Sequence, residues 1–293
     1  MKHQAWLNGE PTNQALAYDR GLAYGDGFFT TILCYQQQPL NWSAHWQRIQ
    51  ASLQRLRLGV VNKTQLVNEL RTALTQSAAD DFCVLKLIVT RGLGGRGYTP
   101  PESAELHRLI YIGPAPLSAP LSLEKGVSLN KISAMVCQTA ASINSSLAGL
   151  KHLNRLENVL ARDEVVANGY DEGLMFNELG HLIGGTQSNV VLIRQTAKGD
   201  QALTPKLTLG GVQGTCLSAL RNLKLDLKWQ EKTMTLKDLT ETDALFVCNA
   251  VRGVQAVKKL RISDQQTIAF AVEPIEPIHQ AWWLWNLNQQ GFN

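Results

Sequence analysis

The chain has 293 residues, 44% hydrophobic and 18% charged, a composition typical of a globular protein with enough apolar material for one or two domains. Its net charge of +4 comes from scattered basic residues, which excludes the dense basic stripe of a nucleic-acid-binding protein. No apolar run approaches the length of a membrane span, and the N-terminus lacks the apolar core of a signal peptide. We therefore expect a cytoplasmic protein with no membrane or nucleic-acid partner.

The cysteines and histidines predict no metal site. The five cysteines are widely spaced and form no C-x-x-C pair, which favours buried, reduced thiols over disulfides or zinc. The six histidines show no metal-ligand spacing either.

The first part of the chain predicts a small unit of strands and two helices. Residues 5–10 read as a strand that turns through Asn-Gly, a strong hairpin signal. Further strands are predicted at 28–35, 82–90 and 106–112, and helices at 43–56 and 63–77. Ser43 is the expected N-cap of the first helix. Three prolines at 113–120 predict a linker at 114–120 between a domain at 1–113 and a larger one at 121–293.

The second part alternates strands with helices, which predicts an α/β fold in two domains. Strands are predicted at 127–133, 172–177, 181–184, 189–194 and 244–248. Helices are predicted after Lys151, from about Gly214, and at 235–241. Trp282 to Trp285 indicate a C-terminal helix that packs on the body or on a partner subunit.

Lys151 is the most informative single residue. Leucines at helical spacing follow it and Ala148-Gly149 precede it as a turn, so it marks the junction of a turn and a predicted helix. A lysine that is desolvated at such a junction has a lowered pKa, and a neutral lysine can bind a carbonyl covalently. A surface lysine beside a helix start is the competing interpretation.

Residues 149–160, Gly-Leu-Lys-His-Leu-Asn-Arg-Leu-Glu-Asn-Val-Leu, resemble the lysine segment of the fold-type-IV pyridoxal-phosphate enzymes, and among them the aminodeoxychorismate lyases. Residues 19–31, 44–49 and 180–190 match the family pattern in the same order. The resemblance implies the two-domain fold of the D-amino-acid aminotransferases, with pyridoxal 5'-phosphate between the domains. It also implies a homodimer.

The resemblance carries roles onto individual residues. Lys151 would be the catalytic residue and would hold the cofactor. Arg48 would grip the cofactor phosphate, because a guanidinium presents a planar fork to phosphate oxygens. Phe29 would be an apolar substrate wall where D-amino-acid aminotransferases place a tyrosine, which weighs against that activity. The other implied cofactor-binding residues are Gly184, Thr186, Ser188, Asn189, Gly214, Thr215 and Asn249.

For two groups of these residues, the residue types themselves suggest a reason for binding the cofactor. Gly214-Thr215 opens a predicted helix, whose free amides and dipole favour an anion, although an ordinary helix start fits the same residues. Thr186, Ser188 and Asn189 suit a turn that directs polar groups at a ligand.

Gly184 is the main departure from the family. Family members carry at this place a glutamate that pairs with the pyridine nitrogen and keeps it protonated, so that the ring can accept electrons. Glu178, on the other arm of the predicted hairpin, is a candidate substitute.

Gly92 to Gly97 satisfy the G-x-G-x-x-G pattern, but Tyr98-Thr99-Pro100-Pro101 follow and open no helix, which excludes a dinucleotide site. The segment instead resembles a loop of the aminodeoxychorismate lyases. Arg91, Arg96 and Tyr98 are therefore candidate contacts for a dicarboxylate substrate. A surface loop with solvated arginines is the alternative.

The resemblance implies a lyase that converts 4-amino-4-deoxychorismate to 4-aminobenzoate and pyruvate in folate biosynthesis. A branched-chain or D-amino-acid aminotransferase of the same fold is one alternative. A catalytically impaired relative is the other, because of Gly184.

Overall fold

The computed structural model describes residues 4–12, 16–77, 79, 81–116, 128–197 and 199–292. The chain divides into two compact units. The first unit contains Met1–Pro120, Lys151–Asn154 and Asn286–Asn293, and the second contains Leu121–Leu150 and Arg155–Trp285. Residues 117–120 of the predicted linker and Val127 of the predicted strand at 127–133 lie outside the described residues.

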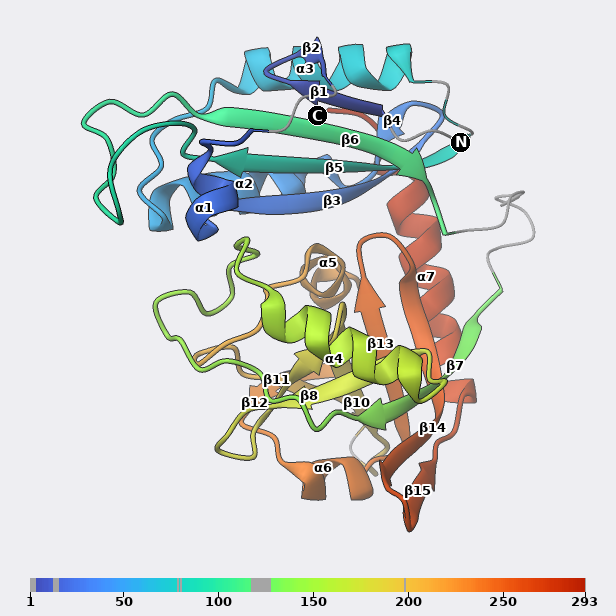
Figure 1. Ribbon diagram of the computed structural model, residues 1–293. Helices are drawn as coiled ribbons and strands as arrows, with labels where there is room; N and C mark the ends of the chain where they lie inside the picture. Colours follow the sequence, from blue (N-terminus) through green and yellow to red (C-terminus); the bar gives the residue numbers. More distant parts are fainter. Residues whose placement is uncertain are drawn as a thin grey trace. The chain divides into compact units, whose positions relative to one another are not determined.

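The first unit contains a six-stranded antiparallel sheet in the order β2-β1-β6-β5-β3-β4 (Figure 1). Its strands are β1 (Gln4–Leu7), β2 (Glu10–Pro11), β3 (Gly27–Tyr35), β4 (Gln38–Pro39), β5 (Phe82–Thr90) and β6 (His107–Pro114). The turn between β1 and β2 is the predicted Asn-Gly hairpin, in which Asn8 and Gly9 both have positive φ.

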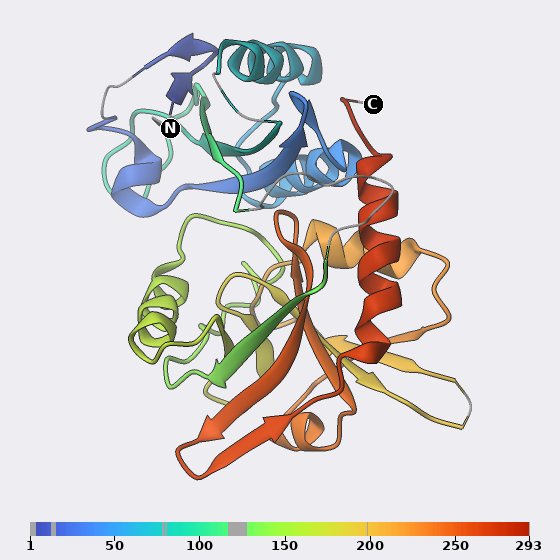
Figure 2. The same cartoon turned by 90° about the vertical axis from the view of Figure 1, so that its right-hand side faces the viewer.

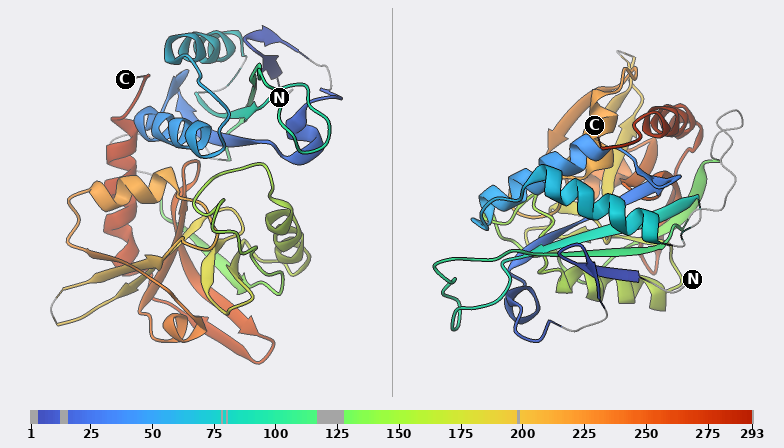
Figure 3. Two further views of the ribbon diagram at one scale, coloured as in Figure 1. Left: turned by 90° about the vertical axis from the view of Figure 1, so that its left-hand side faces the viewer. Right: turned by 90° about the horizontal axis from the view of Figure 1, so that it is seen from above.

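Two helices of 14 residues, α2 (Trp42–Arg55) and α3 (Lys63–Gln76), lie side by side in the view from above in Figure 3. Their apolar faces and one face of the sheet form a single buried core. The N-cap position of α2 is Asn41, in the left-handed region and without a side-chain cap hydrogen bond, so the predicted N-cap, Ser43, was wrong. A short helix, α1 (Arg20–Tyr24), precedes β3.

The second unit is built on a nine-stranded mixed sheet, with the path β12-β11-β10-β13-β14-β7-β8-β9 and β15 paired to β14 (Figure 2). The strands are β7 (Asn130–Val136), β8 (Glu172–Phe176), β9 (Leu182–Gly185), β10 (Asn189–Arg194), β11 (Gln201–Pro205), β12 (Lys228–Lys232), β13 (Ala244–Asn249), β14 (Gly253–Ser263) and β15 (Gln266–Ala269). Strands β7 and β8 pair in parallel, and β8 and β9 form a hairpin.

The helices of the second part of the chain are α4 (Leu156–Ala167), α5 (Thr215–Asn222), α6 (Leu236–Thr240), a 3-10 turn (Glu273–Ile275) and α7 (Glu276–Leu287). The helix predicted directly after Lys151 begins only at Leu156, so this prediction was wrong for residues 151–155. In the described part of the chain, no helix is long and apolar enough to cross a membrane.

Candidate active site

Lys151 belongs to a short extended segment that pairs with the start of β3. The amide of Phe29 donates to the Lys151 carbonyl at 3.0 Å, and the amide of Leu153 donates to the Gly27 carbonyl at 3.1 Å. Between them, Phe28 and His152 form an antiparallel bridge, with the His152 side chain buried. Residues 151–153 therefore form backbone hydrogen bonds with β3, where the sequence predicted the first turn of a helix. These bonds hold Lys151 against β3.

The Gly-Asp-Gly turn before β3 requires its glycines for close packing. A Cβ on Gly27 would lie 2.3 Å from the Val89 carbonyl oxygen, so no larger residue fits there. Gly25 ends α1 with φ +66 in the left-handed region, which glycine adopts without a steric cost. Between them, Asp26 accepts from the Nε atoms of Arg20 and Arg91, both at 2.8 Å.

Two lysines contact the Phe29 ring, Lys151, which the sequence predicted, and Lys86, which it did not. The Lys151 Nζ is 4.4 Å from the ring centroid and the Lys86 Nζ is 5.1 Å from it, so the separation of the two nitrogens cannot exceed the sum of these distances. Both distances lie within the range of cation–π attraction. Burial lowers the pKa of Lys86. Among the described residues no ion pair to Lys86 is found.

Strand alternation explains why Lys86 reaches this place. Lys86 of β5 pairs with Thr31 of β3, and Phe29 pairs with Ile88. These four side chains are half-buried, while the intervening Thr30 and Leu87 are fully buried on the core side. The half-buried sheet face therefore carries Phe29, Thr31 and Lys86 together. A lysine inside an apolar strand was the sequence signal that could have identified Lys86.

Arg48 lies on α2, where its guanidinium donates to the Thr30 hydroxyl at 3.2 Å. Burial lowers the pKa of Arg48 to about 10, which leaves it charged at neutral pH. The Nδ1 atom of His45 lies 2.7 Å from the same hydroxyl oxygen. Burial, and then the charges of Arg48 and Lys151, hold the pKa of His45 well below its ordinary value. His45 and the predicted residue Arg48 therefore share the Thr30 hydroxyl, and the charge of the predicted residue Lys151 also acts on this imidazole.

In the second unit, a buried carboxylate organises the predicted turn at 184–189. Glu172 accepts from the Thr186 hydroxyl, from the Thr186 amide at 3.0 Å and from the Ser188 hydroxyl at 2.7 Å. Because a carboxylate only accepts, both hydroxyl protons are committed to Glu172. The oxygens of Thr186 and Ser188 can therefore act toward a further partner only as acceptors. Sequence reasoning did not single out Glu172.

Gly184 lies on β9 opposite Met175 of β8. Its φ is not in the left-handed region, and an added Cβ would meet only the Ser188 carbonyl oxygen, at 3.2 Å. Glu178 is exposed in the turn between β8 and β9 and does not stand opposite Gly184. Both oxygens of Glu172 accept hydrogen bonds from the turn residues Thr186 and Ser188, which gives this carboxylate a structural role in the second unit.

Two asparagines of the second unit, Asn189 and Asn249, form hydrogen bonds that join the segments carrying the remaining predicted residues. Asn189 donates to the Val212 carbonyl at 2.8 Å, which joins its turn to the loop before α5. A Cβ on Gly214 would lie 1.8 Å from the Asn189 Oδ1 atom, so any larger residue would displace the Asn189 side chain. Asn249 donates to the Gln187 carbonyl at 3.4 Å. Gly214 is the N-cap of α5 and provides no side-chain cap for Thr215 and the rest of the first turn, an arrangement that suits an anion.

The three predicted substrate residues, Arg91, Arg96 and Tyr98, have different surroundings in the loop after β5. The Arg91 guanidinium binds Asp26 and donates to the Leu56 and Arg57 carbonyls at 3.0 and 2.8 Å, so it anchors the loop. This does not support its predicted role as a substrate contact. Arg96 and Tyr98 are exposed, and the Tyr98 ring meets the Tyr24 ring edge-on at 5.5 Å. As expected, Gly92 to Gly97 open no helix.

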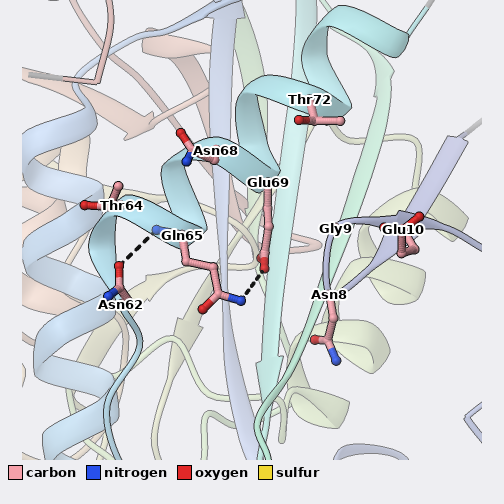
Figure 4. A pocket seen from close by; sticks show the side chains of 9 residues that line it. All are labelled: Asn8, Gly9, Glu10, Asn62, Thr64, Gln65, Asn68, Glu69 and Thr72. Carbon is pink, nitrogen blue, oxygen red and sulfur yellow. Dashed lines mark hydrogen bonds between the residues drawn. The ribbon is translucent and has the colours of Figure 1, made fainter.

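A polar pocket of about 620 Å³ lies elsewhere in the first unit, between the β1–β2 turn and α3 (Figure 4). Its lining contains amide, hydroxyl and carboxylate side chains, and Gln65 donates to Glu69 at 3.1 Å. Glu69 is also held by Arg108. None of the predicted site residues lines this pocket, and ligand sites are typically apolar with a few polar groups. Among the residues described, no group of side chains could hold a metal ion.

The chain is similar to known proteins along most of its length. The sequence family described as amino-transferase class IV matches residues 27–260. An aminodeoxychorismate lyase of Vibrio harveyi is 32% identical over 265 residues, which cover 89% of this chain and 93% of the relative. The crystal structure of 4-amino-4-deoxychorismate lyase from Pseudomonas aeruginosa is 30% identical, with a TM-score of 0.79 over 93% of this chain and 96% of that one. The PLP-bound form of a hypothetical aminotransferase from Mycobacterium tuberculosis, 17% identical, shares the fold with a TM-score of 0.77 over 97% and 99% of the two chains.

Proposed function

The chain belongs to the class IV aminotransferase family, with the fold-type-IV architecture, and from this we propose that it is a pyridoxal-phosphate-dependent aminodeoxychorismate lyase. The reaction would convert 4-amino-4-deoxychorismate to 4-aminobenzoate and pyruvate, a step towards folate. The observation that carries the proposal is Lys151, held against β3 with its ammonium over Phe29 and with Lys86 over the same ring. The similarity to the Vibrio and Pseudomonas lyases along most of the chain supports it.

The residues present fit pyridoxal 5'-phosphate, which combines an aldehyde with a phosphate. Lys151 offers a primary amine, and Arg48 offers a guanidinium that stays charged at neutral pH. In the second unit, the uncapped start of α5 at Gly214 and Thr215 suits an anion. When bound, this cofactor supplies a carbonyl that forms covalent bonds with amines and a ring that accepts electrons. We propose further contacts from Gly184, Thr186, Ser188, Asn189 and Asn249.

Lys151 would also act as the base of the reaction. Its ε-amino nitrogen takes the proton from C4 of the substrate, and the electron pair of that C–H bond forms the new ring double bond as the enolpyruvyl oxygen leaves C3. The enolpyruvate then takes a proton and becomes pyruvate. The ring becomes aromatic, which makes the elimination strongly favourable.

Lys86 would bind a carboxylate of the substrate. It is a half-buried cation with no ion pair among the described residues, and 4-amino-4-deoxychorismate carries two carboxylates. Phe29 would form the apolar wall against the substrate ring, as the sequence predicted. Arg96 and Tyr98, on the exposed loop after β5, remain proposed contacts for the second carboxylate.

We propose a cytoplasmic homodimer. In the second unit, Leu156, Val159 and Leu160 of α4 are each more than half exposed, which is unusual for three apolar side chains on one helix. A second copy of this chain would bury them.

The purified protein provides the test. We expect an absorbance band of lysine-bound cofactor that borohydride treatment removes, and release of 4-aminobenzoate and pyruvate in equal amounts from 4-amino-4-deoxychorismate. Release of a keto acid from branched-chain or D-amino acids, without 4-aminobenzoate, would favour an aminotransferase. A borohydride-sensitive band without either product would identify a catalytically impaired relative.

A further inference from the structure

The buried residues Thr30 and His45 form a polar network with the half-buried Arg48 on the core side of the first unit's sheet. Thr30 is fully buried on β3, and His45 is almost fully buried on α2. The Thr30 hydroxyl oxygen lies 2.7 Å from His45 Nδ1 and accepts from the Arg48 guanidinium at 3.2 Å. A hydroxyl and an imidazole therefore meet an arginine in a setting where each missing hydrogen bond is costly.

The positions of the protons follow from the chemistry of the three groups. A guanidinium can only donate, so Arg48 occupies one lone pair of Thr30. No other acceptor for the Thr30 hydroxyl is found among the described residues, so its single proton is directed at His45 Nδ1. Burial and the neighbouring charges of Arg48 and Lys151 hold the pKa of His45 well below its ordinary value, which keeps the imidazole neutral. Its own proton is then on Nε2.

We propose that Thr30 and His45 are positioning residues that orient the Arg48 guanidinium for an anionic phosphate group. This rests on the proposed function, in which Arg48 holds the phosphate of the cofactor. His45 Nδ1 accepts the proton of the Thr30 hydroxyl and so fixes the direction of this hydroxyl. The Thr30 oxygen then accepts from the Arg48 guanidinium and fixes its direction in turn. Because both positioning groups are neutral, they fix the direction of the guanidinium without neutralising its charge. A carboxylate at the place of Thr30 would instead compete with the phosphate for the arginine.

The experiment compares the binding of pyridoxal 5'-phosphate and of pyridoxal, which lacks the phosphate, to the cofactor-free protein. Thr30→Val keeps the shape of the side chain and removes the hydroxyl. We expect it to weaken binding of pyridoxal 5'-phosphate about tenfold, the scale of one hydrogen bond to a charged group, and to change binding of pyridoxal by less than about twofold. Thr30→Ser, which keeps the hydroxyl, is the matched control and should retain the parent affinity for both. An equal loss for both compounds, or no loss, would overturn the proposal.

A double-mutant cycle separates this proposal from the proposed function. Arg48→Ala should weaken binding of pyridoxal 5'-phosphate by about 30-fold or more, and Thr30→Val should then cause no further loss in the Arg48→Ala background. If Arg48→Ala weakens binding but Thr30→Val does not, the positioning role is wrong and the phosphate role of Arg48 stands. If Arg48→Ala has no effect, both assignments fail. A full effect of Thr30→Val in the Arg48→Ala background would show that Thr30 does not act through Arg48.

The tautomer of His45 gives a readout that does not depend on the cofactor. In the ¹⁵N spectrum of the parent protein, Nδ1 should resonate as an unprotonated nitrogen and Nε2 as a protonated one, without change between roughly pH 6 and pH 8. In Thr30→Val the chemical shift of Nδ1 should move, because its hydrogen-bond donor is gone. A protonated Nδ1 in the parent protein would contradict the direction of the network.

Discussion

The backbone and the side chain of Lys151 both meet the same residue, Phe29. The Phe29 amide donates to the Lys151 carbonyl at 3.0 Å, and the Phe29 ring centroid lies 4.4 Å from the Lys151 Nζ. The lysine is therefore held at two points, its backbone by a hydrogen bond to β3 and its half-buried side chain by the ring of Phe29. A lysine on the surface of a helix would have neither of these two contacts.

Lys151→Ala should abolish the borohydride-sensitive absorbance band and all release of 4-aminobenzoate, because the covalent bond to the cofactor and the proton transfer both need its amine. Lys151→Arg is the matched control, since it keeps a cation over Phe29 but cannot form that bond. Borohydride treatment followed by peptide mapping should place the cofactor on Lys151 in the parent protein alone. A reduced adduct on another lysine would show that the assignment is wrong.

Lys86→Met should raise KM for 4-amino-4-deoxychorismate by about tenfold or more and leave the absorbance band of bound cofactor intact. Methionine keeps the length and the apolar stem, while the charge for the substrate carboxylate is lost. Steady-state kinetics beside an absorbance titration measure the two effects separately. Lys86→Arg should recover much of the loss. An unchanged KM in Lys86→Met would exclude this lysine from substrate binding.

The positions of most strands and helices along the chain could be predicted from local patterns, while some boundaries required tertiary information. The strand at 82–90 and the strand at 189–194 have the predicted bounds, since apolar runs with β-branched residues specify buried strands. The helix after Lys151 was predicted too early because Leu153 matches helical spacing, whereas its amide is bonded to Gly27 in β3. β12 was not predicted, because it is an edge strand in which three of the five residues are charged, and such a segment lacks the apolar pattern of a buried strand.

The candidate site shows the same division between local and tertiary information. Lys151 and Arg48 were predicted because their segments resemble a known family. Lys86 and Glu172 were not, since their significance depends on neighbours that are far away in the sequence. The role of Glu172 is visible only in the structure, where it accepts from the hydroxyls of Thr186 and Ser188. Arg91 was predicted to contact the substrate, but in the structure its guanidinium forms an ion pair with Asp26.

Asp26→Asn should destabilise the protein by about 3 kcal/mol at neutral pH, because it leaves the guanidinium groups of Arg20 and Arg91 without their shared carboxylate. Burial alone would raise the pKa of Asp26, but hydrogen bonds and charge from Arg91 and Arg20 lower it below its usual range. A lowered carboxyl pKa stabilises the fold above the ordinary value near pH 4 and loses this effect as the pH falls through the folded-state value. The stability difference between parent and Asp26→Asn, measured by urea denaturation, should therefore shrink below about pH 4. A difference that is the same at neutral pH and at about pH 3 would contradict this assignment.

Gly184 is the position where this chain departs from the family pattern, and the structure removes one objection to restoring a glutamate there. The backbone of Gly184 is not in the left-handed region, so a side chain causes no strain of that kind. The tightest contact of a new Cβ would be the Ser188 carbonyl oxygen at 3.2 Å, which requires a shift of a few tenths of an ångström. We therefore expect Gly184→Glu to fold, with a melting temperature close to that of the parent.

If a carboxylate at this place increases the capacity of the cofactor ring to accept electrons, Gly184→Glu should speed the loss of the C4 proton or a slow side transamination. Gly184→Gln is the control, because it has the same size without the negative charge. Single-turnover kinetics with substrate deuterated at C4 would measure the proton step, and keto-acid formation would measure the side reaction. A gain in Gly184→Glu that Gly184→Gln lacks would show that the parent chain is an impaired lyase. A folded, cofactor-loaded Gly184→Glu protein with no gain in either rate would show that elimination here does not need the glutamate, as expected if the formation of an aromatic product supplies enough driving force.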